Sequence, residues 1–299
     1  MAHELNLDLV PGLRQGESAN PRAENVFSLG PGLDGLVAGG LERAALHEVI
    51  GAPGEGAPAL AFALAMSLCA TTPHSRLPSH GYRLPLLWVR QEAAADETGP
   101  AYAPGLVDLG LDPSRLTIVT LGRTLDALRA ALDATRCPAL GAVILETTDT
   151  GRTVDLTATR RLALAAEVSG ATVLVVRLAG GASANAARTR WRVGAAPSRT
   201  LTGDELSCFG HSLPPNGSLP PGVAERQAER AGAGLERGKN SDLRGLGPGR
   251  PCFDITLLKR RAGVAGLSAH VEWNRDRRIF EEALSLPLAA VPGRRRLAA

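Results

Sequence analysis

The sequence predicts an α/β protein in which a mainly parallel sheet is covered by helices on both faces. Runs of strand length such as 141–146 and 171–178 are apolar throughout, as expected of strands that are buried on both faces. Segments of helical character separate these runs along the chain, which favours parallel strand–helix–strand units. The 299 residues are 44% hydrophobic and 21% charged, a balance that fits a globular protein with a sizeable core.

The individual elements follow from apolar runs and their boundary residues. The expected strands are 46–50, 84–90, 115–119, 141–146, 171–178 and 189–195. The expected helices are 57–70, 102–109, 124–134 and 155–169. Pro58 is compatible with the first of these helices because proline is tolerated in a first turn. Asp155 is the expected N-cap of the last helix, and Gly170 its C-terminal stop.

The pattern changes after residue 202. Residues 203–250 hold ten glycines and five prolines, a composition that buries too little apolar area to offset the entropy of ordering, so we expect a disordered insertion. Apolar alternation resumes at 252–261 and 268–273, which predicts a hairpin on the edge of the main sheet. The predicted organisation is therefore a flexible arm (1–25), a core (26–202), the insertion (203–250), a hairpin that completes the core (251–283) and a mobile basic tail (284–299).

Charge and lysine usage exclude several kinds of mechanism. Lys239 and Lys259 are the two lysines among 33 basic residues, so 31 are arginines and no Schiff-base lysine lies in the first 238 residues. The net charge of +3 divides into about −2 for residues 1–249 and +5 for residues 250–299, where ten basic residues face five acidic ones. This balance lacks the strongly basic stripe of a dedicated DNA-binding domain.

The cysteines and the apolar segments indicate a cytoplasmic protein. The four cysteines lie far apart and form no C-x-x-C pair, which argues against a zinc site or a disulfide framework and fits a reducing compartment. No run of 18 residues is free of charged and turn residues, so no transmembrane helix is expected. The first residues lack the basic start and apolar core of a secretory signal.

A glycine-rich loop, GAPGEG (51–56), stands between the first strand and the first helix, as in a phosphate-binding P-loop. Gly51 and Gly56 have the spacing of the pattern G-x-x-x-x-G-K-[ST], but Ala57 and Pro58 replace its lysine and its hydroxyl residue. The lysine would reach the nucleotide phosphates and the hydroxyl would hold Mg²⁺, so we expect weak or no nucleotide binding. An ordinary strand-to-helix turn is the alternative interpretation of this loop.

The order of segments around the loop resembles the RecA-type ATPase core. The run FSLGPGLDGLVAGGLERAALHEVIGAPGEG is similar to the entry into that core, and the resemblance covers about residues 26–195. Within this group the chain resembles the ImuA family, through FSLGPGLDGLVAGGLERAALHEV, LPLLWVRQE, YAPGLVDLGLDP, LTATRRLALAAEVSG, RTRWRVGAAPS and VEW. The resemblance implies a RecA-type P-loop core. Because the loop lacks the lysine and the hydroxyl residue, the resemblance does not imply nucleotide chemistry at this loop.

Three residues occupy positions that carry ATP chemistry in the RecA-type family. Glu92 matches the catalytic glutamate, Glu146 the Mg²⁺-binding carboxylate of the Walker B strand, and Tyr102 the tyrosine that stacks on adenine. Each of these residues also has a structural interpretation. Glu92 would be a solvated charge at a strand end, Tyr102 would pack against its own helix, and Glu146 would lack a Walker B task without a bound metal and nucleotide.

Basic residues supply the candidate contacts to nucleic acid or partners. Arg188, Arg190 and Arg192 alternate around Trp191 at strand spacing, so the arginines share one face and the tryptophan takes the other. Such a strand could bind single-stranded nucleic acid, or it could be a half-buried edge strand with a solvated face. The preceding loop, 179–187, lies where RecA-type proteins carry a DNA-binding loop, but it is short and uncharged, which leaves direct DNA binding undecided. Further basic clusters are Lys259, Arg260 and Arg261 near the hairpin and Arg294, Arg295 and Arg296 in the tail.

Three functions compete. The ImuA resemblance implies a non-catalytic adaptor in SOS-induced, error-prone translesion DNA synthesis, with the Y-family polymerase-like protein ImuB, an error-prone replicative-type DNA polymerase and RecA as partners. A residual ATPase is the second hypothesis, and the missing lysine and hydroxyl count against it. A cell-division inhibitor is the third, because ImuA-like proteins are sometimes labelled SulA-like. We expect no cofactor, no metal and no catalytic residue.

Overall fold

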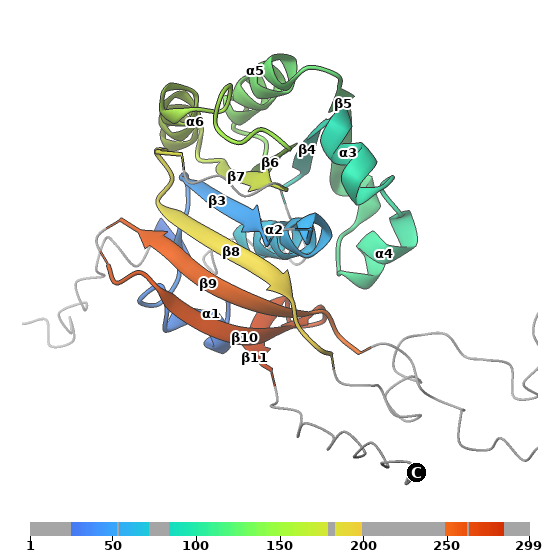
Figure 1. The fold of residues 1–299 in the computed structure, drawn as a ribbon, viewed down its shortest axis with the longest axis vertical. Helices are drawn as coiled ribbons and strands as arrows, with labels where there is room; N and C mark the ends of the chain where they lie inside the picture. The colour runs from blue at the N-terminus through green and yellow to red at the C-terminus, as the bar shows by residue number, and fades with distance from the viewer. Residues whose placement is uncertain are drawn as a thin grey trace, which may run out of the picture.

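The computed structural model describes residues 25–52, 54–71, 84–178, 183–198, 249–261 and 263–283 (Figure 1). The arm predicted at 1–25 lies outside the described residues except for its last residue. The insertion predicted at 203–250 lies outside them except for residues 249 and 250, and the tail predicted at 284–299 lies outside them entirely.

The predicted fold class is confirmed: a mainly parallel sheet is covered by helices and extended by antiparallel C-terminal strands. In the described part of the chain, the main sheet has nine strands in the order β11-β10-β9-β8-β3-β7-β6-β4-β5. The six strands from β8 to β5 in this order are parallel, and β9, β10 and β11 join antiparallel beside β8. The strands are β3 (Leu46–Gly51), β4 (Leu86–Gln91), β5 (Leu116–Leu121), β6 (Ala142–Thr147), β7 (Thr172–Arg177), β8 (Thr189–Ala195), β9 (Cys252–Arg260), β10 (Leu267–Asn274) and β11 (Ile279–Glu282).

Helices lie on both faces of the parallel part, so its strands are buried on both sides. In β7, Leu174 and Val176 pack in the cluster that contains α2 (Gly56–Ala70), whereas Val173 and Val175 pack in the cluster of α5 (Thr124–Thr135) and α6 (Leu156–Ser169). This is the physical reason for the continuous apolar runs in the sequence. The side chain of Asp155 accepts a hydrogen bond from the Ala158 amide, and Gly170 is left-handed, so both predicted ends of α6 are confirmed.

Several short elements escaped the sequence analysis. They are β1 (Val26–Phe27) and β2 (Leu41–Glu42), which pair with each other, α1 (Pro31–Asp34), α3 (Glu92–Thr98), the 3-10 turn Pro113–Arg115 and β11. The helix expected at 102–109 is shorter and forms α4 (Ala103–Asp108). Elements of two to seven residues carry too little apolar periodicity to be recognised from sequence.

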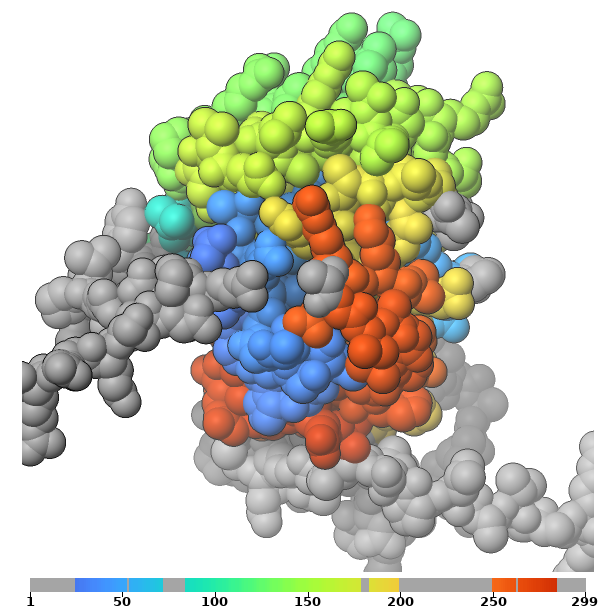
Figure 2. All heavy atoms as spheres, turned by 90° about the vertical axis from the view of Figure 1, so that its left-hand side faces the viewer, coloured from blue at the N-terminus to red at the C-terminus, as the bar shows by residue number. Residues whose placement is uncertain are grey.

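The N-terminal segment and the C-terminal strands lie side by side on the surface (Figure 2). The Phe280 amide donates a 2.6 Å hydrogen bond to the Leu29 carbonyl. Gly30 has a φ of 104°, and a Cβ there would lie 2.6 Å from the Phe280 carbonyl oxygen, so both its conformation and its surroundings require glycine. The unpredicted strand β11, which pairs with β10 of the predicted hairpin, thus connects the sheet edge to the N-terminal segment.

Buried His47, on β3, stands in a chain of hydrogen bonds that fixes its neutral form. Its Nε2 lies 2.9 Å from the Glu42 carbonyl and its Nδ1 lies 2.8 Å from the Thr189 hydroxyl, which in turn accepts from the Trp191 indole. Nε2 must therefore donate to the carbonyl, and Nδ1 accepts the hydroxyl proton. Burial lowers the pKa of His47 from 6.5 to about 4, against the hydrogen bond to the Glu42 carbonyl, and the nearby charge of Arg188 lowers it further.

We expect this histidine to make stability depend on pH. The unfolded chain binds a proton at His47 as the pH falls below 6.5, whereas the folded chain does not bind it until about pH 4. The contribution of neutral His47 to the free energy of unfolding is therefore fully present above pH 6.5 and is lost as the pH falls to 4. The loss from this group is about 3 kcal/mol. Urea unfolding of a His47→Gln variant should lack this loss of unfolding free energy between pH 6.5 and 4. A variant of exposed His270 on β10, His270→Gln, should retain it. An identical slope in the wild type and His47→Gln would contradict the assignment.

Candidate functional site

The loop between β3 and α2 is a tight turn closed by its own backbone. The Glu55 amide donates a 2.8 Å hydrogen bond to the Ala52 carbonyl, and the Ala52 amide donates to the Val193 carbonyl of β8 at 2.9 Å. Gly54 takes a φ of 77° inside this turn. The loop is therefore pinned to β8 by the backbone amide of Ala52, which is not available to a phosphate.

Carboxylates flank the beginning of α2, where an anion would bind in a P-loop. Glu55 is the N-cap residue, and its Oε2 accepts a 2.6 Å hydrogen bond from the Ala195 amide at the end of β8. A Cβ built on Gly56 would lie 3.0 Å from Oε1 of Glu97, which places a second carboxylate beside the first turn. Negative charge is already present near this helix N-terminus, and these carboxylates would repel an approaching phosphate.

The first turn of α2 carries no side chain that could offset this repulsion. Gly56, Ala57 and Pro58 are its first three residues, so the turn contains neither a cation nor a hydroxyl, and proline provides no amide. Gly51 ends β3 and Gly56 begins α2, in the strand–loop–helix order that the spacing predicts, and Ala57 and Pro58 follow in the first turn of the helix.

Glu146, at the end of β6, is fully buried and held by other side chains. Its Oε2 accepts hydrogen bonds from the Arg90 Nε at 2.7 Å and the Trp88 indole at 2.9 Å. Its Oε1 lies 2.6 Å from the Thr98 hydroxyl and 3.3 Å from Arg90 Nη2. Both oxygens are therefore occupied, and the negative charge is neutralised inside the protein.

Arg90 is anchored as firmly as its partner. Its guanidinium lies 4.4 Å from the Trp88 ring centroid, and its Nη2 donates to the Gly99 carbonyl at 2.9 Å and to the Thr98 hydroxyl at 2.6 Å. Only 3% of the Arg90 side chain is exposed, so breaking the pair with Glu146 would leave a buried charge without compensation. A carboxylate held in this way is poorly suited to binding a metal ion.

Glu92 and Tyr102 lie apart from this buried group and are exposed. Glu92 is the first residue of α3 rather than the last of β4, because Gln91 already ends the strand and caps the helix. Tyr102 is 70% exposed, and its ring lies 3.2 Å from where a Cβ of Gly105 would be, so it covers the first turn of its own helix α4.

Arg188 directly precedes β8, and Arg190 and Arg192 lie on it, with Trp191 fully buried on the opposite face from these two. Their guanidinium groups differ in use. Arg190 binds the buried carboxylate of Glu48 and the Ser183 carbonyl, and Arg188 forms ion pairs with Glu42 at 3.1 Å and Glu167 at 3.3 Å. Arg192 is exposed.

Glu48 is the centre of a second buried charge cluster that the sequence analysis missed. Arg177, fully buried at the end of β7, donates to Glu48 Oε1 at 2.6 Å and to the Val154 carbonyl at 2.6 Å. Asn185 donates to the other carboxylate oxygen. A signal existed in the sequence: HEVI, GAVILE and VLVVR each carry one charged residue in a buried strand, and such charges require partners.

The cluster at the hairpin is partly inside the protein. The Lys259 ammonium donates to the Asn185 carbonyl at 2.9 Å, and burial, followed by the charge of Arg190, lowers its pKa, which Glu48 opposes. Arg260 is half-buried and Arg261 is exposed. The tail residues Arg294, Arg295 and Arg296 lie outside the described residues.

The described residues meet the requirements of neither a metal site nor a membrane-spanning helix. Among the described residues, no group of three or more histidine, cysteine, aspartate or glutamate side chains is placed to hold a metal ion. Over the same residues, no helix combines the length and the apolar character needed to cross a membrane.

No protein-family description matches the sequence, and no curated protein matches it significantly. Among solved structures, the chain is similar to a RadB recombinase, with a TM-score of 0.46 and 12% sequence identity, over 86% of this chain and 100% of that one.

Proposed function

We propose that this chain is a non-catalytic adaptor with a RecA-like fold that acts in damage-induced, error-prone DNA synthesis. The observation that carries the non-catalytic part is the occupied carboxylate of Glu146, at the position where the ImuA and RecA-type resemblance implies a Mg²⁺ ligand. Arg90, Trp88 and Thr98 satisfy both of its oxygens. The damage-response part rests on the order of sequence segments shared with the ImuA family.

The partners proposed for this adaptor are a Y-family polymerase-like protein of the ImuB type, an error-prone replicative-type DNA polymerase and RecA. Among the candidate basic residues that the structure describes, Arg192 and Arg261 are exposed, and a direct contact with DNA would use them. Arg188 and Arg190 are less suited to that role because they already bind carboxylates of the same chain.

We expect the purified protein to hydrolyse ATP more slowly than about 0.01 s⁻¹, with or without Mg²⁺, since the loop lacks the lysine and the hydroxyl residue that would organise the transition state. The physical reason is the combination of Ala57 and Pro58 in the first turn of α2 with the carboxylates of Glu55 and Glu97 beside it. A coupled phosphate-release assay measures this rate. Faster turnover that disappears in a Gly56→Asp variant would show a working nucleotide site and overturn the proposal.

The adaptor role is tested in cells that carry the chain's gene as the single source of the protein. Deletion of residues 284–299 should reduce co-purification with the polymerase-like partner and the frequency of damage-induced mutations, because these residues hold three of the chain's basic side chains. Glu92→Gln should leave both unchanged, since Glu92 is exposed at the start of α3. A silent deletion together with loss of mutagenesis in Glu92→Gln would favour a nucleotide cycle. Co-purification with a division-ring protein would favour the cell-division hypothesis.

A further inference from the structure

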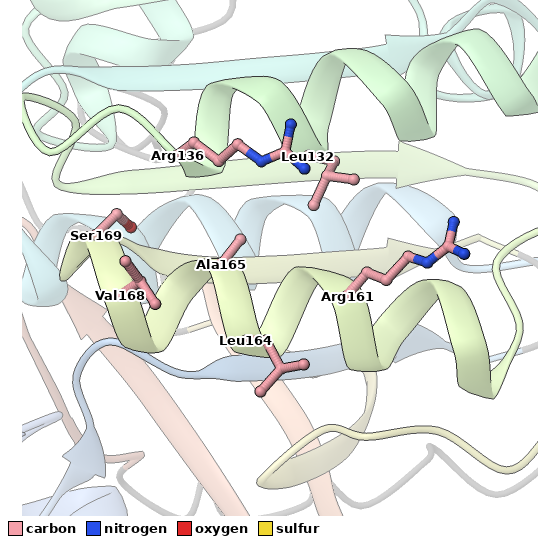
Figure 3. A pocket seen from close by; sticks show the side chains of 7 residues that line it. All are labelled: Leu132, Arg136, Arg161, Leu164, Ala165, Val168 and Ser169. Atoms are coloured by element: carbon pink, nitrogen blue, oxygen red, sulfur yellow. The ribbon is translucent and has the colours of Figure 1, made fainter.

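A shallow apolar groove of about 630 Å³ runs between α5 and α6, on the outer side of the helical layer (Figure 3). Leu132 of α5 lies on one side of it. On the α6 side, Leu164, Ala165 and Val168 line it. Figure 3 shows the two helices side by side, and most of the lining residues belong to α6.

Two apolar side chains of this groove, Leu164 and Val168, are exposed to solvent, whereas Leu132 also packs against the core beneath α5. Both helices bury their inner faces through other residues: Ala127 and Ala131 in α5, and Leu162 and Ala166 in α6. Val168 is 90% exposed and Leu164 is 53% exposed, although the outer face of a helix that covers a sheet is ordinarily polar. Exposed apolar side chains that lie beside one another and are rimmed by polar residues are a feature of interaction surfaces.

Arginines stand at the two ends of the groove. Arg161 lies one helical turn before Leu164, and Arg136 lies one turn after Leu132 (Figure 3). Within the described part of the chain, Arg161 forms no ion pair, and Arg136 pairs with Asp133 of its own helix between two exposed side chains. Exposed pairs of this kind contribute little, so both guanidinium groups remain available to an incoming carboxylate.

We propose that this groove binds an amphipathic helix of a partner protein that carries aliphatic side chains on one face and carboxylates at the edges of that face. Helix-in-groove recognition uses apolar anchors at helical spacing, which the row Leu164, Ala165 and Val168 can receive. From Arg161 to Ser169 the groove extends over about 12 Å of helix, enough for about two turns of a bound helix. This surface lies outside the candidate nucleotide site and does not depend on the function proposed above.

The charge of the groove also argues against the chain's own C-terminal tail as the segment that binds there. The chain's own tail has leucines between residues 284 and 291, but Arg294, Arg295 and Arg296 follow them. Placed in the groove, this triple arginine would meet Arg136 or Arg161 with like charge. An acidic segment avoids that repulsion and gains two charge-assisted hydrogen bonds at the groove's ends.

The test uses a fluorescent synthetic helix of about 14 residues, near the shortest length at which an isolated helix is stable in water. It has leucines at helical spacing with glutamates beside them, and a second peptide has lysines in place of the glutamates. Fluorescence anisotropy with the full-length chain should show binding of the glutamate peptide, and the lysine peptide should bind at least about tenfold more weakly.

Variants on α6 locate the binding surface. Arg161→Glu and Leu164→Ser should each weaken binding of the glutamate peptide by about tenfold. Arg160→Glu and Leu156→Ser change exposed residues of the same helix that do not line the groove, and they should leave affinity within about twofold. Melting temperatures should agree among the four variants, because surface substitutions have small effects on stability.

Each other outcome overturns the proposal. No binding of the glutamate peptide, equal binding of both peptides, or equal weakening by the control variants would show that the groove does not select this chemistry. Self-association of the free chain that Arg161→Glu abolishes, measured by sedimentation, would show that a second copy covers the groove. The peptide and sedimentation readouts do not involve nucleotide or mutagenesis, so their failure is distinguishable from failure of the adaptor function.

Discussion

Replacing Glu146 by alanine should lower the free energy of unfolding by about 3–5 kcal/mol, the range found when one member of a buried ion pair is removed. The substitution leaves the Arg90 guanidinium buried with its charge uncompensated, because the arginine stays between the Trp88 ring and the Gly99 carbonyl. The Trp88 indole and the Thr98 hydroxyl also lose an acceptor. Urea unfolding monitored by circular dichroism measures the loss.

A double variant separates this structural role from a ligand-binding one. Arg90→Met with Glu146→Leu removes both charges, and it should recover most of the stability, because apolar residues of similar volume often replace a buried pair without loss. A carboxylate kept for metal or nucleotide binding behaves differently. In that case Glu146→Ala would leave stability unchanged or raised while abolishing a measurable affinity for Mg²⁺–ATP, and the structural interpretation would be wrong.

The second large effect is expected at Phe62, for which alanine should lower the free energy of unfolding by about 3–5 kcal/mol. This fully buried ring of α2 has centroid distances of 6.0 Å to Trp191, 5.6 Å to Phe253 and 4.9 Å to Phe280. It therefore joins the helix after the candidate loop to β8 and to two of the three antiparallel C-terminal strands. The cavity left by alanine would be shared by all of them.

Controls for Phe62 test whether the loss comes from packing at this junction. Phe62→Leu keeps most of the volume and should lose less than half as much as Phe62→Ala, while Val168→Ala, on the exposed face of α6, should change stability by less than about 0.5 kcal/mol. Hydrogen exchange of Phe62→Ala should rise first in β9–β11, since these strands depend on the aromatic contacts. A loss equal to that of Val168→Ala would contradict the packing argument.

The candidate nucleotide site illustrates how far residue types alone can lead. Ala57 and Pro58 follow Gly56 directly in the chain, so the missing lysine and hydroxyl are local facts that need no structure. The opposing carboxylates are not local. Glu97 reaches the first turn of α2 from α3, and Arg90 neutralises Glu146 from the neighbouring strand, although 56 positions separate the two residues. Pairing across strands depends on register, which a single sequence does not reveal.

The basic strand shows the same division. Alternation placed Trp191 and the arginines on opposite faces, because side chains in a strand alternate with a period of two residues. Whether an arginine is free to contact a partner depends on ion pairs with Glu48 on β3, Glu42 on β2 and Glu167 on α6. Sequence spacing gives the direction of a side chain, whereas its partners come from elements that are distant in the chain.

By itself, the sequence determined the fold class, the order of the main strands and helices and the absence of P-loop side chains, because each depends on composition or on contacts within a few residues. Tertiary structure alone decided that Glu146 and Glu48 are closed into ion pairs, that a third C-terminal strand contacts the N-terminal segment, and that α5 and α6 leave an apolar groove between them. These features arise where separate elements meet, and a buried charge is tolerated only through partners that folding brings to it.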